Sequence, residues 1–224
     1  MIDVLFVNPG NSKKIYQDLS KTYSAIETPT WSLLLAESCR SAGFSVSILD
    51  VNAENITNEE SKKRVEDLNP RLICFVVYGQ NVNAGTVSMS GATELSRYLK
   101  ENNKGIVWRK NGIPFMNPPE RVVPSDRMDI DLPGYAWDLL PYDKKPLDLY
   151  RSPLWHGEYD QKKRSPYAAI QTSLGCQFSC NFCMINIINR NDNDEIGVAG
   201  NYSKMRFWSP NFIIKEFDKL IDLG

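Results

Sequence analysis

The chain has 224 residues, of which 42% are hydrophobic and 24% charged, an ordinary composition for a globular protein. Its 26 lysines and arginines are balanced by 27 acidic residues, which excludes a protein that binds nucleic acid or anionic membranes through bulk charge. No apolar run approaches the roughly 20 residues of a bilayer span, and the N-terminus lacks a basic signal-peptide region, so we expect a cytoplasmic protein without a membrane span or nucleic-acid partner.

The first hundred residues alternate between apolar strands and amphipathic helices. The apolar run 2–7 ends at Asn8-Pro9-Gly10 and predicts a buried strand that stops at a turn. Two further strands are predicted at 44–50 and 71–79, and the third has the most buried composition. Helices are predicted at 28–43, 57–68 and about 86–101. The order β-α-β-α-β predicts a parallel sheet with right-handed crossovers.

The first helix has clear end signals, with Thr28 as candidate N-cap, Pro29 at the first helical position and Gly43 as the stop. Ligands of parallel α/β sheets bind at the carboxyl ends of the strands, here residues 8–10 and 78–83. Doubly wound domains commonly carry five or six strands, whereas three precede residue 104. The fold class is therefore α/β, with a truncated doubly wound, Rossmann-like sheet.

The pattern changes near residue 104. A short hairpin is predicted around Asn111-Gly112, because that pair favours a type I′ turn. Residues 116–165 are rich in proline and predict an irregular linker draped over the surface, although Trp137 and Trp155 indicate packing rather than disorder. Asp129 and Asp131 resemble paired carboxylates, but on an extended segment both would lie on one solvated face.

The last segment begins with a predicted strand at about 167–173, continues through a cysteine-rich loop, and ends in a helix with Ser209 as N-cap. The apolar stripe of this helix is predicted to comprise Ile213, Phe217, Leu220 and Ile221. With no second strand in view, this β-loop-α unit is interpreted as the opening of a β/α barrel.

Three of the five cysteines lie within eight residues, as Cys176, Cys180 and Cys183 at the spacing C-x3-C-x2-C. Gly175 eases the turn before the first of them. Three thiolates can converge on one metal centre, and because closed zinc sites and standard iron-sulfur clusters use four protein ligands, three leave one position open. An open position indicates a bound substrate or cofactor.

The stretch "CQFSCNFC" resembles the C-x3-C-x-aromatic-C signature of radical S-adenosylmethionine (SAM) enzymes, with Phe182 in the aromatic position. The resemblance implies a [4Fe-4S] cluster on the three cysteines, whose open iron chelates SAM, while Phe182 packs near the adenine. Reductive cleavage of SAM would give a 5′-deoxyadenosyl radical that abstracts hydrogen from substrate. It also implies an electron donor such as flavodoxin or ferredoxin, and a small-molecule or lipid-like organic substrate.

Residues 1–103 and the linker phrase "DIDLPGYAWDLLP" resemble the cobalamin (B12)-binding domain and connection of one large radical SAM subfamily. The resemblance makes cobalamin a possible cofactor. The residues expected to face it are Asn8, Pro9, Gly79, Gln80 and Asn81. They can equally be ordinary turn residues. The motif D-x-H-x-x-G is absent and the later strands are missing, so we expect weak or no cobalamin binding by this chain.

The resemblance divides the chain into an incomplete B12-binding-like domain (1–103), a hairpin and linker (104–165) and the start of a radical SAM barrel (166–224). In the complete protein, we expect a radical SAM enzyme of the cobalamin-dependent type, a transferase that performs methyl transfer or an enzyme that performs a radical rearrangement. The chain reads as a fragment that alone does not turn over, and no catalytic residue is assigned.

Other interpretations remain open. Zinc could bind the three cysteines with the only histidine, His156, in a cobalamin- or nucleotide-binding module with a structural metal, or the chain could be a nonfunctional remnant. Cys39 and Cys74 fall in a helix and an apolar strand, where free cysteine behaves as a small hydrophobic residue.

Overall fold

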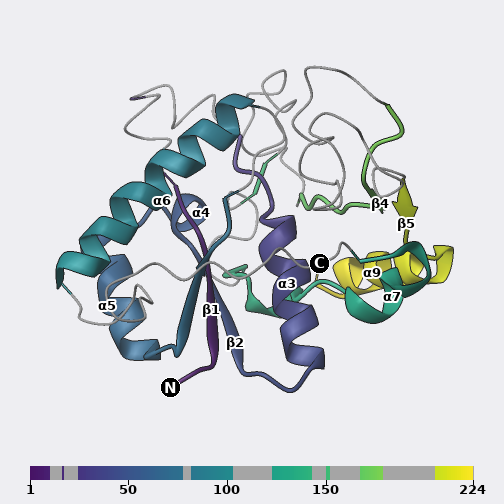
Figure 1. Cartoon of the computed structure of the whole chain (residues 1–224), viewed down its shortest axis with the longest axis horizontal. Helices are drawn as coiled ribbons and strands as arrows, with labels where there is room; N and C mark the ends of the chain where they lie inside the picture. Colours follow the sequence, from purple (N-terminus) through teal and green to yellow (C-terminus); the bar gives the residue numbers. More distant parts are fainter. Residues whose placement is uncertain are drawn as a thin grey trace, which may run out of the picture.

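The computed structural model describes residues 1–10, 17, 25–77, 82–102, 123–142, 150–151, 167–178 and 205–223. These residues form an α/β structure with a three-stranded parallel sheet, and a separate two-stranded antiparallel pair lies near the C-terminal helix (Figure 1). None of the helices in these ranges combines the length and the apolar character needed to cross a membrane.

The sheet is built around β1 (Val4–Asn8), which pairs in parallel with β2 (Val46–Asp50) on one side and β3 (Leu72–Phe75) on the other. This confirms the predicted parallel arrangement. The expectation that the third strand is the most buried is wrong, because β1 is central and buried over four of its five residues, whereas Leu72 of β3 is 53% exposed. A long apolar run does not reveal which strand has neighbours on both sides.

Helices cover both faces of the sheet, with α3 (Thr30–Ser41) on one side and α5 (Asn58–Leu68) and α6 (Val82–Asn102) on the other (Figure 1). Alternate residues of β1 therefore enter two different cores, as the two-residue period of a strand requires. The core on the α3 side includes Val4, Phe6, Ile48, Leu33, Leu34 and Ala36. The opposite core includes Leu5, Val7, Leu49, Val65, Leu95 and Leu99.

The ends of α3 correct one prediction and confirm another. The N-cap position is Pro29, not Thr28, and no side chain caps the helix. The hydroxyl of Thr28 instead accepts a hydrogen bond from the backbone N–H of Ala169, at 3.0 Å. A distant segment thus competes for a hydroxyl that local sequence assigns to the cap. Gly43 follows the helix with φ of +89°, the left-handed conformation expected of a glycine stop.

Two further helix starts depend on side-chain caps. Thr57 and Glu60 form a reciprocal capping box at α5, in which the Thr57 hydroxyl accepts from the Glu60 N–H at 3.2 Å. The short helix α4 (Val51–Glu54) was not predicted. It begins directly after β2, where the Asp50 carboxylate accepts from the Ala53 N–H at 3.0 Å.

Residues 123–142 are buried more deeply than a linker draped over the surface would be. They form the turn η1 (Ser125–Arg127), the short helix α7 (Met128–Asp131) and the turn η2 (Trp137–Leu139). Their buried side chains, which join the core on the α3 side, are Met128, Leu132, Tyr135, Ala136, Trp137 and Leu140. The surface prediction is wrong here because the seven prolines of residues 116–165 suggested irregular backbone, and irregular backbone can still carry core residues. The packing predicted for Trp137 is confirmed, whereas Trp155 and the hairpin around Asn111-Gly112 lie outside the described residues.

Asp129 and Asp131 lie in α7 and not on an extended segment, which corrects their predicted setting. Asp131 pairs with Arg127 at 2.5 Å across one helical turn. The Arg127 guanidinium lowers the pKa of Asp131 below its ordinary value. Asp129 accepts from the backbone N–H of Ser209 at 3.0 Å. The two carboxylates thus have separate structural partners.

The C-terminal helix α9 (Pro210–Asp222) begins where predicted, since the Ser209 hydroxyl accepts from the Phe212 N–H at 3.2 Å. Its buried face is only partly the predicted one. Ile213 and Leu220 of the predicted stripe pack against the core, whereas Phe217 and Ile221 are 49% and 74% exposed. The most buried residues of the helix are instead Phe212 and Glu216. Counting apolar residues misplaces the centre of the face because a charged residue faces inward.

Candidate metal centre

The cysteine loop starts from a short paired base. Strand β4 (Ser173–Leu174) pairs antiparallel with β5 (Arg206–Phe207), so the predicted unit does have a second strand. The pairing brings the chain before the cysteines beside the chain that returns after them. In Figure 1, this base lies toward the carboxyl ends of the parallel strands. A loop closed at its base loses less entropy when its interior residues are ordered around a ligand.

Cys176 is the first residue of the motif and the one that the structure describes. It follows Gly175, whose φ of +92° confirms the predicted need for a glycine at this turn. The Cys176 side chain is half-buried and its thiol is free of any disulfide. A free, partly accessible thiol at the end of a strand has the chemistry that a metal ligand requires.

The other predicted site residues lie outside the described residues, namely the cluster ligands Cys180 and Cys183, the SAM contact Phe182, and His156, the fourth ligand of the alternative zinc site. Within the described ranges, no group of three or more histidine, cysteine, aspartate or glutamate residues could hold a metal ion. Cys39 and Cys74 pack against the core, and burial raises the pKa of both thiols, as expected of structural cysteines. The fit of a cluster therefore depends on the donor type at Cys176 and on the spacing of the motif.

The segment that leads into β4 is held by two hydroxyl groups from distant parts of the chain. The Thr28 hydroxyl binds the N–H of Ala169, as described above. The Tyr135 hydroxyl binds both backbone groups of Gln171: it accepts from the N–H at 2.8 Å and donates to the carbonyl at 3.1 Å. Gln171 precedes Cys176 by five residues. The predicted strand at about 167–173 is thus wrong for residues 167–172, which lie in no strand and are held by side chains before β4 pairs with β5.

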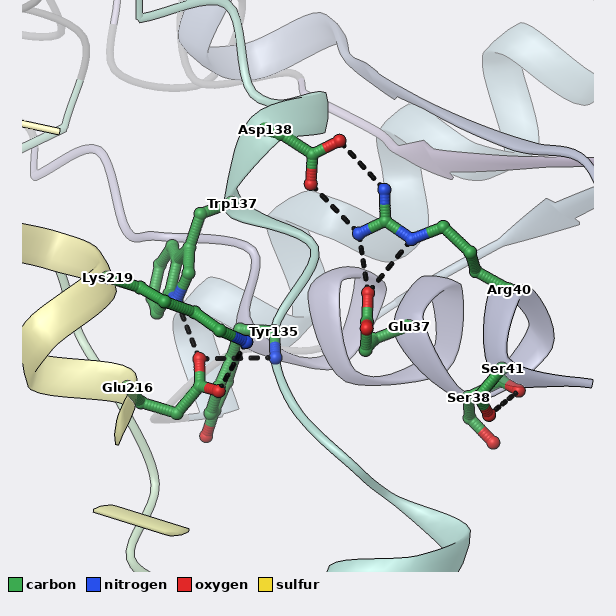
Figure 2. Close-up of polar contacts among 9 residues, drawn as sticks. All are labelled: Glu37, Ser38, Arg40, Ser41, Tyr135, Trp137, Asp138, Glu216 and Lys219. Carbon is green, nitrogen blue, oxygen red and sulfur yellow. Dashed lines mark hydrogen bonds and ion pairs between the residues drawn. The ribbon is translucent and has the colours of Figure 1, made fainter. Parts of the chain in front are cut away.

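Tyr135 is itself fixed by a buried carboxylate on α9 (Figure 2). Glu216, which is 1% exposed, accepts from the Tyr135 N–H at 3.3 Å and from the indole N–H of Trp137 at 2.8 Å. Its other oxygen pairs with the Lys219 ammonium at 2.8 Å. Gly134 permits this approach, because a Cβ there would lie 3.0 Å from the Glu216 oxygen. A buried carboxylate with three donors is the arrangement that offsets the cost of burying its charge.

Aromatic rings complete the same region. Tyr135 stacks on Trp137 with ring centroids 5.0 Å apart, and Trp208, the residue after β5, stacks on Phe212 at 5.4 Å. The Trp208 indole N–H donates to the carbonyl of Leu132 at 3.0 Å. The residues after the cysteine loop therefore pack on the same 123–142 segment as the residues before it.

A second cluster lies at the carboxyl edge of the parallel sheet. Asp50, at the end of β2, is 1% exposed and accepts hydrogen bonds from the Asn8 side-chain amide, the Ala53 N–H and the Tyr150 hydroxyl, at 2.9, 3.0 and 2.9 Å. Burial raises the pKa of Asp50 to about 6 despite these donors, and burial beside Asp50 raises the pKa of Tyr150. Sequence reasoning missed Asp50. The signal in the sequence is an aspartate at the end of an apolar strand. Because an acid is rarely buried without partners, an aspartate at such a position indicates a buried carboxylate with hydrogen-bond donors around it.

Two of the five predicted cobalamin contacts, Asn8 and Pro9, lie in the part of the chain that the structure describes. The Asn8 side-chain amide donates to Asp50, and Pro9 is buried. The adjoining Gly10 lies so close to α4 that a Cβ there would be 2.5 Å from Asn52, and a Cβ at Gly91 of α6 would be 2.9 Å from the Gly10 carbonyl oxygen. The other three predicted contacts, Gly79, Gln80 and Asn81, lie outside the described residues.

No family model, curated protein or solved structure matches this chain. The chemistry of the centre therefore has to be argued from the residues of the chain itself. Those residues are a cysteine motif with one described free thiol, a strand pair that closes the loop at its base, and a buried network that holds the segment before the loop.

Proposed function

We propose that the chain belongs to a radical SAM enzyme in which Cys176, Cys180 and Cys183 hold a [4Fe-4S] cluster. The observation that carries the proposal is the C-x3-C-x2-C spacing with an aromatic residue, Phe182, before the third cysteine. When bound, the cluster would supply the electron that cleaves SAM to a 5′-deoxyadenosyl radical. An odd count of five cysteines, three of them in one loop, favours thiolate ligands over disulfides.

Within this proposal, different parts of the described structure have different structural roles. The β4–β5 pair holds the two ends of the loop together. Gly175 turns the chain directly after β4, and Cys176 follows this turn. In the proposal, β4 is the first strand of a barrel, where active sites lie at the carboxyl ends of the strands. The parallel sheet is the truncated B12-binding-type domain. Asn8 is hydrogen-bonded to Asp50 and Pro9 is buried, which supports the expectation of weak or no cobalamin binding by this chain.

The substrate class proposed is a small or lipid-like organic molecule that undergoes methyl transfer or rearrangement, with a flavodoxin- or ferredoxin-type electron donor. The metal-binding part can be tested without the substrate. The full chain is reconstituted anaerobically with iron and sulfide, and bound iron, sulfide and zinc are measured. We expect iron and sulfide near four of each per chain. The reduced protein should give an electron paramagnetic resonance (EPR) signal that changes when SAM is added.

Replacing Cys180 with Ala should abolish this cluster, because it removes one of three thiolates. Cys39→Ala is the matched control, since Cys39 packs in α3 away from the motif, and it should retain the wild-type iron content. Zinc bound at one equivalent, with no EPR signal after reconstitution, would favour the zinc module and overturn the proposal.

A further inference from the structure

The route from the core to the first cysteine is short and is held at two points. Tyr135 binds both backbone groups of Gln171, and Thr28 binds the N–H of Ala169 two residues earlier. Between Gln171 and Cys176 lie the two residues of β4, flanked by Thr172 and the left-handed Gly175. Five residues of extended chain span at most about 17 Å, and pairing with β5 removes most of their remaining freedom.

The chain that follows the cysteine loop also reaches Tyr135. Trp208 follows β5 directly and stacks on Phe212, one helical turn before Glu216. Glu216 then binds the backbone N–H of Tyr135 and the indole of Trp137. The chain before the cysteine loop and the helix after it are therefore joined through one tyrosine and one carboxylate.

Holding a helix in place with a buried carboxylate costs free energy, because the charge must leave water. A well-packed apolar side chain of similar size often holds such a contact as well or better, because it avoids the cost of removing a charge from water. What the carboxylate adds is direction: one oxygen fixes two N–H groups, and the other receives the Lys219 ammonium at 2.8 Å. The interaction specifies the rotation of α9 about its axis relative to the 134–137 backbone.

We propose that Tyr135, Glu216 and Thr28 are positioning residues that set the place of Cys176 at the mouth of the cysteine loop. The inference deepens the function proposed above and rests on it for the role of the bound cluster. Its geometric content, the position of the Cys176 thiol, concerns the protein without metal and can be measured separately.

The test uses Tyr135→Phe in the full chain, which keeps the buried ring and removes only the hydroxyl that binds Gln171. Site-resolved alkylation followed by mass spectrometry measures the reactivity of Cys176 in the metal-free protein. Loss of the anchoring bonds should increase the alkylation rate about threefold to tenfold, the range that corresponds to one net hydrogen bond. Tyr98→Phe is the matched control, because its hydroxyl binds Glu59 on the opposite side of the sheet, and its Cys176 rate should equal that of the wild type.

A second pair of variants addresses the case in which Tyr135→Phe folds poorly. Thr28→Val removes the hydroxyl that holds Ala169 while keeping the shape of the side chain, whereas Thr28→Ser keeps the hydroxyl. The valine variant should show the faster alkylation and the serine variant should restore the wild-type rate. Equal Cys176 rates in wild type, Tyr135→Phe and Thr28→Val would overturn the inference.

After anaerobic reconstitution, Tyr135→Phe should also shift the EPR g-values or the midpoint potential of the cluster, while Tyr98→Phe should not. The two readouts separate the two proposals. Faster Cys176 alkylation in a protein that never binds iron would support the positioning role and refute the cluster function. A wild-type cluster signal in Tyr135→Phe, together with unchanged alkylation, would refute the positioning role and leave the cluster function intact.

Discussion

At the scale of single residues, Asp50 combines complete burial with three hydrogen-bond donors from three parts of the chain. Asn8 belongs to β1, Ala53 to α4, and Tyr150 comes from far along the sequence. The donors stabilise the ionised carboxylate, yet burial raises the pKa of Asp50 to about 6 from its ordinary value of 3.8. The nearby Glu54 carboxylate acts in the same direction. Desolvation therefore outweighs three hydrogen bonds at this site.

This pKa predicts how stability depends on pH. Between about pH 4 and pH 6, the folded state retains a proton on Asp50 that the unfolded state has released, so the free energy of unfolding falls as pH rises through this window. The stabilisation is fully present below about pH 4 and is lost above about pH 6. A shift of about two pKa units corresponds to about 3 kcal/mol. Denaturant unfolding of wild type and Asp50→Asn across this range should show their difference in stability changing by that amount.

Asp138→Asn is a control with the opposite sign. The Arg40 guanidinium lowers the pKa of Asp138, so the stability contributed by this carboxylate is present above its unfolded pKa and is lost as pH falls. If the Asp50→Asn and wild-type stability curves ran parallel from about pH 4 to pH 7, the buried carboxyl would not titrate in this window and the prediction would fail.

At the scale of secondary-structure elements, α9 is positioned by its start and by its inward-facing charge. Ser209 accepts from the Phe212 N–H at 3.2 Å, and its own N–H donates to Asp129 at 3.0 Å. The helix therefore begins against α7, immediately after the β4–β5 base of the cysteine loop. Because Glu216 lies two turns further along, the start of the helix and its buried carboxylate together fix its orientation.

Removing the Ser209 cap should lower stability without changing the fold. Ser209→Ala leaves the Phe212 N–H without its side-chain acceptor, and the expected loss is about 1 kcal/mol in the free energy of unfolding. Ser41→Ala, at the exposed end of α3, is the control, since its hydroxyl donates to the Ser38 carbonyl and caps no N-terminus; it should change stability by less than about 0.5 kcal/mol. A loss for Ser209→Ala no larger than that for Ser41→Ala would contradict the capping role.

At the scale of the whole molecule, one ion-pair network joins α3, which covers one face of the parallel sheet, to the segment that carries Tyr135 (Figure 2). The Arg40 guanidinium on α3 donates to both oxygens of Asp138 at 2.7 and 2.8 Å. Its Nε–H donates to Glu37. The two carboxylates raise the pKa of Arg40, which stays charged at every accessible pH. The Ala136 N–H adds a bond to the Leu33 carbonyl of α3 at 3.3 Å. These contacts connect the α/β part of the molecule to the segment that carries Tyr135, which in turn binds the chain before the cysteine loop.

A double-mutant cycle on Arg40 and Asp138 measures this connection. Arg40 is 38% exposed and Asp138 is 63% exposed, so solvent screens the pair and we expect a coupling energy of about 0.5 to 1 kcal/mol at low salt, smaller at high salt. The single variants Arg40→Gln and Asp138→Asn and their combination are compared by denaturant unfolding. A coupling energy of zero at low salt would show that the ion pair does not hold the two parts together.

Much of the α/β part could be predicted from local patterns. The apolar run before Asn8, the helix after Thr57 and the glycine stop at Gly43 are determined by neighbouring residues, and each lies where the sequence predicted. The turn at Gly175 and the cap at Ser209 are local signals of the same kind. The cysteine spacing is also readable from the sequence, although the structure describes only Cys176 of the three.

What the sequence by itself determined about this protein was therefore the three parallel strands, the longer helices and the cysteine donors of the proposed centre. Only the tertiary structure decided which strand is central, which face of α9 is buried, and where Thr28, Asp50 and Glu216 find their partners. The physical reason is that these outcomes depend on groups that are distant in the chain: two of the three partners of Glu216 lie 79 and 81 positions away, and Tyr150 lies 100 positions from Asp50. Local patterns record the preferences of a segment, whereas the burial of a charge depends on donors that only folding brings to it.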